Sequence, residues 1–276
     1  MLRNWWQQLQ ARREDAAVAR REIPADLWKR TLVRYPFLRR HLEADNAELK
    51  RLTSLFLDRK EFNAAGGLRP SDAMVVAIAA QAALPVLRLG LDRYDGFVGI
   101  VVHAGQVVAR REVAGDDGLV HAYEEVLAGE AMEGGPVMLS WQDVRAAGPM
   151  AAHGYNVVIH EFAHVLDMAD GLADGVPVLP TGLPREQWCS TLHGAYEDFV
   201  RAVDAFEAGG PQTLLDPYGA TAPEEFFAVV SEAFFVSPSL LMQTYPALYA
   251  LLQRFYRQDP LLDIAPRGTR KGARGA

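Results

Sequence analysis

Cysteine is nearly absent from this sequence, with Cys189 as its single example among 276 residues. One cysteine excludes an intrachain disulfide, and it also excludes a metal site built on several thiolates. The N-terminal segment lacks the continuous apolar core and the small-residue cleavage site of a secretory signal. We therefore expect a protein of a reducing, cytoplasmic compartment.

Long apolar runs and positive charge are scarce as well. The most apolar stretch, residues 73–84, ends at Pro85 and is shorter than the roughly 20 residues that a membrane-spanning helix needs. The formal net charge of −7 removes the usual electrostatic attraction to nucleic acid, because a phosphate backbone favours clustered lysine and arginine. We expect neither a membrane span nor direct binding of nucleic acid.

Hydrophobic residues make up 50% of the chain, which is enough for a sizeable core. Between residues 24 and 84 they recur at three- and four-residue spacing, which predicts short helices. Ser71 and Asp72 predict the N-cap of a buried helix over 73–84. The sequence therefore indicates a mainly helical N-terminal region over residues 1–84, packed on the part that follows.

After Pro85 the pattern changes to runs that are typical of strands, punctuated by glycine. These runs cover residues 86–91, 97–102, 107–113 and 137–141. Helical spacing returns after Gly154, a loop rich in glycine and proline covers 171–184, and residues 266–276 are typical of a disordered tail. The predicted fold class is α+β, with a small mixed sheet and helices in one domain over 85–265.

Residues 160–164 read HEFAH, which matches the pattern H-E-x-x-H within a stretch that is typical of a buried helix. On an α-helix, residues four apart differ by about 40° in direction and about 6 Å in rise, so His160 and His164 can reach one metal ion. Glu161 lies about 100° further round, where its carboxylate can take a proton from water beside the metal. We predict His160 and His164 as ligands and Glu161 as the general base. A chance match, expected on the order of once per hundred such sequences, would leave ordinary hydrogen-bonded histidines.

Two histidines leave a tetrahedral zinc ion short of a third protein ligand. Asp170 lies about 15 Å along the helix axis from His160, which is too far for a shared ion. Asp167 is better placed as an acceptor for the imidazole of a ligand. The third ligand is therefore expected on another helix.

The segment that begins at Pro223 is strongly apolar and contains three glutamates, Glu224, Glu225 and Glu232. Buried glutamates need a partner such as a cation or a metal ion. Glu225 and Glu232 are seven residues apart and share one helix face. Residue spacing alone leaves the choice among the three glutamates open.

Four blocks of the sequence belong together in a known family. They read HEFAHVLDMADG, GVPVLP, DPYGATAPEEFFAVVSEAFF and FYRQDPL. This set resembles the Mlc titration factor A family of bacterial zinc peptidases, over most of the chain except the N-terminal segment and the tail. The spacing of Tyr218 and Glu225 is also similar to that in the catalytic domain of anthrax lethal factor.

The resemblance implies a role for each candidate. It makes Glu225 the third metal ligand, Tyr218 a hydrogen-bond donor to the oxyanion, and Glu232 a residue that packs or bonds behind the ligands. The implied fold is zincin-like, with the edge strand that pairs with an extended peptide inside residues 134–141. The implied activity is that of an aminopeptidase, and the implied partner is a sugar-responsive transcriptional repressor of the Mlc type.

Peptide hydrolysis with one Zn²⁺ per chain is therefore the expected function, with a peptide or protein as the substrate. Three alternatives remain: a non-catalytic regulator that sequesters a repressor and holds zinc structurally, a hydrolase of non-peptide amides, and a purely structural zinc protein. Four further histidines are expected at the surface or in hydrogen bonds rather than on a metal, namely His103, His121, His153 and His193.

Overall fold

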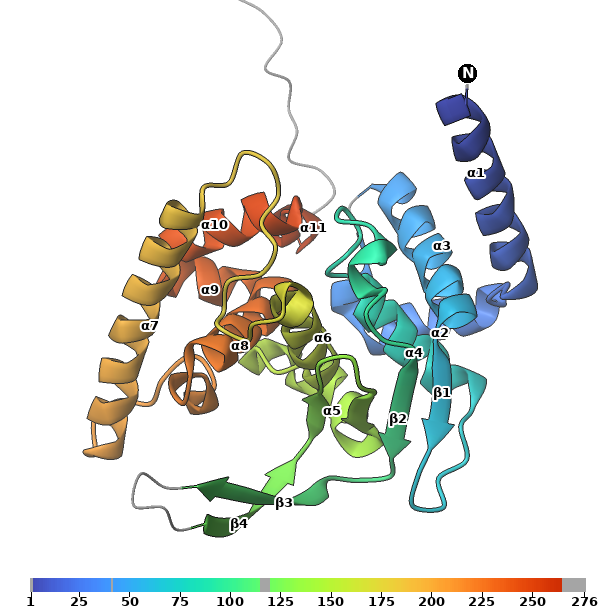
Figure 1. The fold of residues 1–276 in the computed structure, drawn as a ribbon. Helices are drawn as coiled ribbons and strands as arrows, with labels where there is room; N and C mark the ends of the chain where they lie inside the picture. Colours follow the sequence, from blue (N-terminus) through green and yellow to red (C-terminus); the bar gives the residue numbers. More distant parts are fainter. Residues whose placement is uncertain (1, 41, 115–119, 265–276) are drawn as a thin grey trace, which may run out of the picture.

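The computed structural model describes residues 2–40, 42–114 and 120–264 (Figure 1). The helices are α1 (Leu2–Arg20), α2 (Ala25–Arg34), α3 (Glu43–Arg59), α4 (Asp72–Ala83), α5 (Trp141–Met150), α6 (Val157–Asp167), α7 (Arg185–Glu207), α8 (Pro223–Val236), α9 (Pro238–Thr244), α10 (Pro246–Tyr256) and α11 (Pro260–Ile264). The short 3-10 helices are η1 (Pro36–Leu38), η2 (Leu91–Tyr94), η3 (Ala151–His153), η4 (Met168–Asp170) and η5 (Pro217–Ala220). The predicted tail over 266–276 lies outside the described residues.

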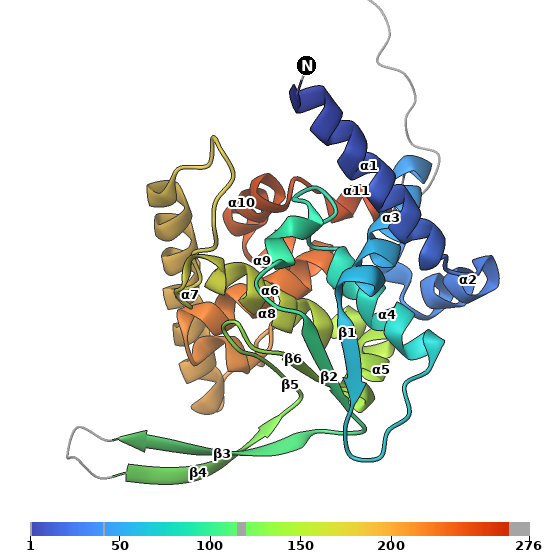
Figure 2. The ribbon, with the colours of Figure 1, turned by 45° about the vertical axis from the view of Figure 1, so that its right-hand side comes forward.

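The strands are β1 (Glu61–Ala64), β2 (Gly99–His103), β3 (Val107–Ala114), β4 (Val120–Leu127), β5 (Gly129–Ala131) and β6 (Val137–Ser140). A four-stranded sheet has the order β1-β2-β6-β5, in which β5 alone runs antiparallel to its neighbour. Strands β3 and β4 form a separate antiparallel hairpin that projects from the body of the molecule (Figures 1 and 2). The predicted α+β class with a small mixed sheet is confirmed.

Strand β6 lies in the segment 134–141 that was expected to hold the edge strand, but it is an interior strand. Val137 pairs with Ile100 of β2 on one side and with Ala131 of β5 on the other. Gly134 has a φ of 61°, in the left-handed region that glycine adopts without steric cost, and this permits the turn that folds β5 back over β6. The expectation for 134–141 is therefore wrong, because β6 is interior and the edge strands of this sheet are β5 and β1.

Residues 86–91, expected as a strand, form turns and the start of η2. The N–H of Leu87 donates to the carbonyl of Leu84 at 3.2 Å, and the N–H of Leu89 donates to that of Val86 at 3.1 Å. Bonds that span three residues belong to helical turns, not to an extended strand. Val86 and Leu87 are buried, so the apolar run reflects burial and not strand pairing.

Strand β1 lies within the region 1–84 that was predicted as mainly helical. It pairs in parallel with β2, from Glu61 opposite Gly99 to Ala64 opposite Val102. Its four residues are too few for an alternating pattern to stand out in the sequence. The sheet thus takes strands from both sides of residue 84, and a division into two domains there remains a proposal.

Helix α4 matches the predicted buried helix over 73–84. The hydroxyl of Ser71 accepts a hydrogen bond from the N–H of Met74 at 3.3 Å, which is the expected N-cap. The helix is buried almost throughout and packs against α3 and α6.

Helices α6 and α8 pack on each other (Figure 1), and α6 also contacts β5. Phe162 of α6 is fully buried, and its ring lies 5.5 Å from Phe56, 4.9 Å from Tyr94 and 5.8 Å from Phe97 between centroids. Every residue of α8 from 226 to 235 is buried. These contacts hold the two helices in one fixed arrangement. In the described parts of the chain, no helix combines the length and apolarity needed to cross a bilayer.

Candidate metal centre

Helix α6 presents two histidines on one face. The side chain of Asn156 caps the helix, since its Oδ1 accepts a hydrogen bond from the N–H of Ile159 at 3.0 Å. One turn separates His160 from His164, and their Nε2 atoms lie 3.1 Å apart. The structure therefore brings the two imidazoles together as their spacing predicts.

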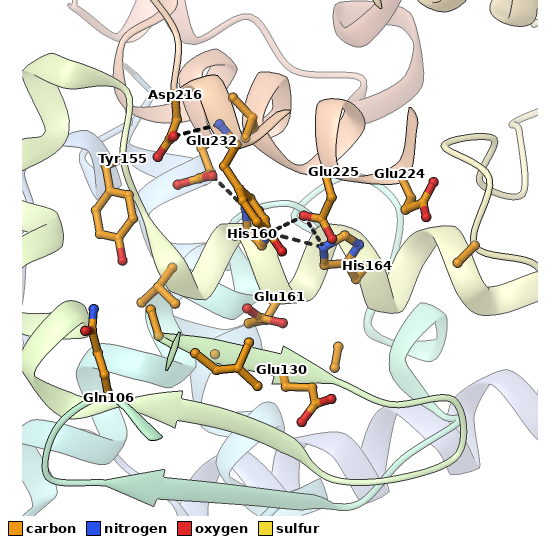
Figure 3. A pocket seen from close by; sticks show the side chains of 18 of the residues that line it. Gln106, Glu130, Tyr155, His160, Glu161, His164, Asp216, Glu224, Glu225 and Glu232 are labelled. Atoms are coloured by element: carbon orange, nitrogen blue, oxygen red, sulfur yellow. Dashed lines mark hydrogen bonds and ion pairs between the residues drawn. The ribbon is translucent and has the colours of Figure 1, made fainter. Parts of the chain in front are cut away.

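Glu225 reaches the same point from α8. Its Oε2 lies 3.1 Å from Nε2 of His160 and 3.3 Å from Nε2 of His164 (Figure 3). Glu224 is directed away from the two histidines, and Glu232 lies on the other side of the His160 ring (Figure 3). Of the three glutamates left open by spacing, Glu225 alone faces both Nε2 atoms.

These donor atoms fit a zinc ion. One atom from each of His160, His164 and Glu225 lies within 4.8 Å of the others. Ligands about 2.0–2.1 Å from a tetrahedral ion lie roughly 3.3 Å from one another, close to the separations observed here. Two imidazoles and one carboxylate are also the donor set of many catalytic zinc sites.

The charge pattern of the cluster favours a cation at its centre. Burial by itself raises the pKa of Glu225, but hydrogen bonds and charges from His160 and His164 lower it to about 2. Burial by itself lowers the pKa of His160, but Glu225 and Glu232 raise it well above its ordinary value. The carboxylates thus attract positive charge, as those of a metal site do.

Glu161 lines the same cavity without joining the ligand cluster (Figure 3). Its side chain is buried, and burial raises its pKa to about 8, with the charges of Glu225, Glu232 and Glu130 adding to the rise and that of His160 opposing it. A carboxylate with a pKa near neutrality can both take and return a proton at physiological pH. The position suits the predicted general base.

Tyr218 belongs to η5 and is 43% exposed, with its ring centroid 6.2 Å from that of His160. Asp216 fixes the start of η5, because its Oδ1 accepts a hydrogen bond from the N–H of Tyr218 at 3.0 Å. Both residues line the cavity, which has a volume of about 470 Å³. The phenol therefore lies at the mouth of the candidate site.

Asp167 does not have the predicted position beside a ligand imidazole. Its Oδ2 accepts a hydrogen bond from the N–H of Gly175 at 2.9 Å, so the carboxylate holds the loop that follows α6. The Nδ1 of His160 instead lies 2.8 Å from Oε1 of Glu232. The prediction for Asp167 is wrong because this residue, at the end of α6, directs its side chain toward Gly175 in the loop that follows the helix.

Sequence reasoning missed several residues of the cavity. Glu130 on β5 and Tyr155 before α6 both line it. Their only signal in the sequence is proximity to the strand and helix that carry the site. Of the remaining histidines with described side chains, His103, His153 and His193, none joins the metal cluster, and the side chain of His121 lies outside the described part.

Comparison with known proteins places these features in a family. A family model described as glucose-regulated metallo-peptidase M90 matches residues 6–257. A protein named Mlc titration factor A from Pectobacterium atrosepticum is 37% identical over 227 residues, which cover 82% of this chain and 84% of that protein. Its namesake from Edwardsiella ictaluri is 44% identical over 197 residues, covering 70% and 73%. The namesake from Serratia proteamaculans is 39% identical over 221 residues, covering 79% and 82%.

The match extends from α1 to the end of α10 and so includes every element that contributes to the cavity. A metallopeptidase family implies a metal, and the cluster on α6 and α8 supplies suitable donors. The chain therefore belongs to the glucose-regulated metallo-peptidase M90 family, together with the proteins named Mlc titration factor A.

Proposed function

We propose that this chain is a zinc-dependent peptidase in which His160, His164 and Glu225 hold the metal and Glu161 is the general base. The observation that carries the proposal is the convergence of these four side chains in one open cavity. Membership in a metallopeptidase family supports a hydrolytic use of that cavity. The proposal includes a zincin-like catalytic domain over 85–265 with α6 as its active-site helix, whose sheet is completed by β1 from the region before residue 84.

The chemistry divides between the metal and the side chains around it. When bound, zinc supplies a Lewis acid that polarises a peptide carbonyl and makes water more acidic. Glu161 takes the proton from the attacking water and passes it to the departing amine. Tyr218 donates a hydrogen bond from its phenol to the oxyanion of the tetrahedral intermediate.

An extended peptide would lie along β5. This strand bonds to β6 on one side, and its residues also line the cavity. The open side of an edge strand offers N–H and carbonyl groups to an incoming chain. Pairing along Gly129–Ala131 would bring a peptide bond next to Glu161.

The charge of the cavity favours a substrate with a free amino group, and we propose aminopeptidase action on this ground. The described lining includes no lysine or arginine, and it contains Glu130, Asp216 and Glu224 in addition to the residues of the centre. A cleft of one charge sign attracts the opposite charge. The protonated N-terminus of a peptide meets this requirement.

A regulatory partner forms a second part of the proposal. The relatives are named Mlc titration factor A, and we propose that this chain binds a transcriptional repressor of the Mlc type in the cytoplasm. A non-catalytic regulator with structural zinc is the alternative. Structural zinc sites are usually closed by four protein ligands, whereas here Glu161 and Tyr218 line the cavity beside three donors, which supports catalysis.

Metal analysis combined with peptide hydrolysis tests the peptidase proposal. We expect about one zinc per chain in the wild type and in Glu161→Gln, loss of zinc in His160→Ala and Glu225→Ala, and hydrolysis by the wild type alone. Zinc at full occupancy without hydrolysis of any peptide in a mixed library would support the non-catalytic regulator. Retention of zinc by His160→Ala would contradict the assigned ligands.

Matched substrates test the aminopeptidase part. Alanine p-nitroanilide should be hydrolysed faster than its N-acetylated form, and Glu130→Gln should reduce this preference. Glu133→Gln is the control, because Glu133 lies three residues further on, in the turn that follows β5, and does not line the cavity. Equal rates on both substrates would contradict the preference while leaving peptide hydrolysis intact.

A further inference from the structure

A chain of buried hydrogen bonds runs from His160 into the N-terminal half of the protein. His160 directs Nε2 toward Glu225 and His164, so Nδ1 faces the opposite side of the ring. There Oε1 of Glu232 lies 2.8 Å from Nδ1 (Figure 3). An imidazole can offer the Nε2 lone pair to a metal only if its proton is on Nδ1, and an acceptor at Nδ1 favours that tautomer.

Glu232 is itself held at both oxygens. It is 3% exposed, and while Oε1 faces His160, Oε2 accepts a hydrogen bond from the backbone N–H of Asn156. A carboxylate bonded at both oxygens cannot rotate away from the imidazole. The orientation of His160 therefore depends on the position of Asn156.

Asn156 is fixed from two directions. Its Oδ1 accepts from the N–H of Ile159 as the cap of α6, and its Nδ2 donates to Oε1 of Gln81 at 2.9 Å. The residue is fully buried, with an extended backbone of φ −160° and ψ 96° that places it just before the first turn of the helix. Both ends of its amide are thus engaged.

Gln81 completes the chain from α4. It is fully buried in a helix whose other buried residues are apolar, and its Nε2 donates to the carbonyl of Ala77 at 3.0 Å. That bond leaves Oε1 to accept from Asn156. Burying an amide costs free energy unless its groups are hydrogen-bonded. The Gln81 amide meets this requirement through its bonds to Ala77 and Asn156.

We infer that Gln81 and Asn156 are positioning residues for the metal ligand His160, acting through Glu232. The inference rests on the proposed zinc site and extends it to α4, in the region before residue 84. Groups that bond to the ligands of a metal typically change its affinity by about 10–100-fold when they are removed. Because Gln81 acts through two further residues, its loss should have a smaller effect than the loss of Glu232.

The test measures zinc affinity by competition with a chelating dye, without any substrate. Gln81→Met removes the acceptor for Asn156 at similar volume, and Asn156→Ser keeps the helix cap but removes the donor to Gln81. We expect Glu232→Gln to weaken zinc binding by about 10-fold or more, and Gln81→Met and Asn156→Ser to weaken it by roughly 3- to 10-fold each. The double variant should show less than the product of the two single effects, because both changes break the same bond.

Ser231→Ala is the matched control. Ser231 precedes Glu232 on α8. Its buried hydroxyl donates to the backbone carbonyl of Phe227 and accepts from the hydroxyl of Tyr256 at 2.8 Å. The change therefore removes buried hydrogen bonds that do not lead to His160. It should leave zinc affinity within about twofold of the wild type. The visible absorption of the cobalt-substituted protein should shift in Gln81→Met and not in Ser231→Ala.

Two results would overturn the inference while the proposed function stands. One is zinc affinity within twofold of the wild type in both Gln81→Met and Asn156→Ser, in protein that still hydrolyses peptides. The other is an equal loss of affinity in Ser231→Ala, which would show a general effect of stability. A wild type that binds no zinc would overturn the proposed function and this inference together.

Discussion

Single residues decide whether the carboxylate of Glu161 has room to act. The ideal Cβ position at Gly129 lies 2.4 Å from Oε1 of Glu161, much closer than real atoms approach. Glycine on β5 therefore leaves the space that the side chain of Glu161, the proposed general base, occupies. The requirement is steric, because the backbone of Gly129 does not adopt a left-handed conformation.

The variant Gly129→Ala tests this requirement. The added methyl group must displace the Glu161 carboxylate, so kcat should fall by roughly 100-fold or more, within the range of about 100- to 10,000-fold that general acid–base catalysis contributes. Zinc content should stay at the wild-type value, since the ligands are untouched. Gly96→Ala is the control, because a Cβ there meets nothing within 4 Å. An unchanged kcat in Gly129→Ala would show that the Glu161 carboxylate does not need the space beside Gly129.

Asp167 gives a prediction about pH. Burial raises the pKa of its carboxyl from 3.8 to about 7. The folded protein therefore binds this proton more tightly than the unfolded chain does, and between about pH 4 and pH 7 the free energy of unfolding falls as pH rises. Each unit of pKa difference corresponds to about 1.4 kcal/mol.

Asp167→Asn removes this titration and keeps an acceptor for the N–H of Gly175. Urea unfolding of metal-free protein from pH 4 to pH 8 should show that the variant becomes more stable relative to the wild type as pH rises through this window. Subtracting the two curves cancels the other titrating groups. Parallel curves would show that Asp167 does not titrate in this range.

At the scale of elements, α6 carries three site residues, but its neighbours fix its position. The fully buried ring of Phe162 lies against Phe56 of α3, Tyr94 of η2 and Phe97 before β2. Phe162 is two residues, or about 200°, round the helix from His160, which bonds to glutamates of α8, so the aromatic contacts lie on roughly the opposite face. Aromatic packing thus fixes α6 on one side, and the contacts of Glu225 and Glu232 with His160 fix it on the other.

Phe162→Ala should remove the aromatic contacts on this side of α6. Truncating a fully buried phenylalanine costs about 3–5 kcal/mol of unfolding free energy through lost burial and the remaining cavity. The measurement is the midpoint of denaturant unfolding with an unchanged m-value. Phe206→Ala on α7 is the comparison, because Phe206 is 37% exposed and its truncation should cost under about 1 kcal/mol. Similar losses in both variants would contradict the special role of Phe162.

At the scale of the whole molecule, the N-terminal helices and the site share one core. Strand β1 pairs with β2, α3 supplies Phe56 to the packing around α6, and α4 contacts α6 directly. Helix α1 lies at the periphery (Figure 1), and among its described side chains only that of Ala17 is buried. Stability should therefore depend unequally on the segments before residue 84.

Two truncations test this difference. A fragment over 85–276 loses β1 and Phe56, which exposes the edge of β2 and opens the core, so we expect no cooperative thermal unfolding by circular dichroism. A fragment over 21–276 loses only α1 and should unfold cooperatively with a full complement of zinc. Cooperative unfolding of the 85–276 fragment would establish a separable domain at residue 84 and contradict the expectation.

Local patterns were enough to predict those features that depend on nearby residues. The four-residue spacing of His160 and His164 places both imidazoles on one face of any α-helix, and Ser71 caps α4 as its sequence context predicts. Local patterns failed at residues 86–91, where a buried apolar run of helical turns has the composition of a strand. They also failed at β1, which is too short to show a period.

The sequence by itself therefore determined the α+β class and the pairing of His160 with His164 on one helix, because backbone periodicity relates residues one turn apart. Only the tertiary structure decided which glutamate faces the histidines, which one bonds to Nδ1 of His160, and that β5 rather than β6 is an edge strand. Glu225 and Glu232 lie 65 and 72 residues from His160 along the chain. Contacts over such separations depend on how α6, α8 and the sheet pack, and no local spacing encodes that packing.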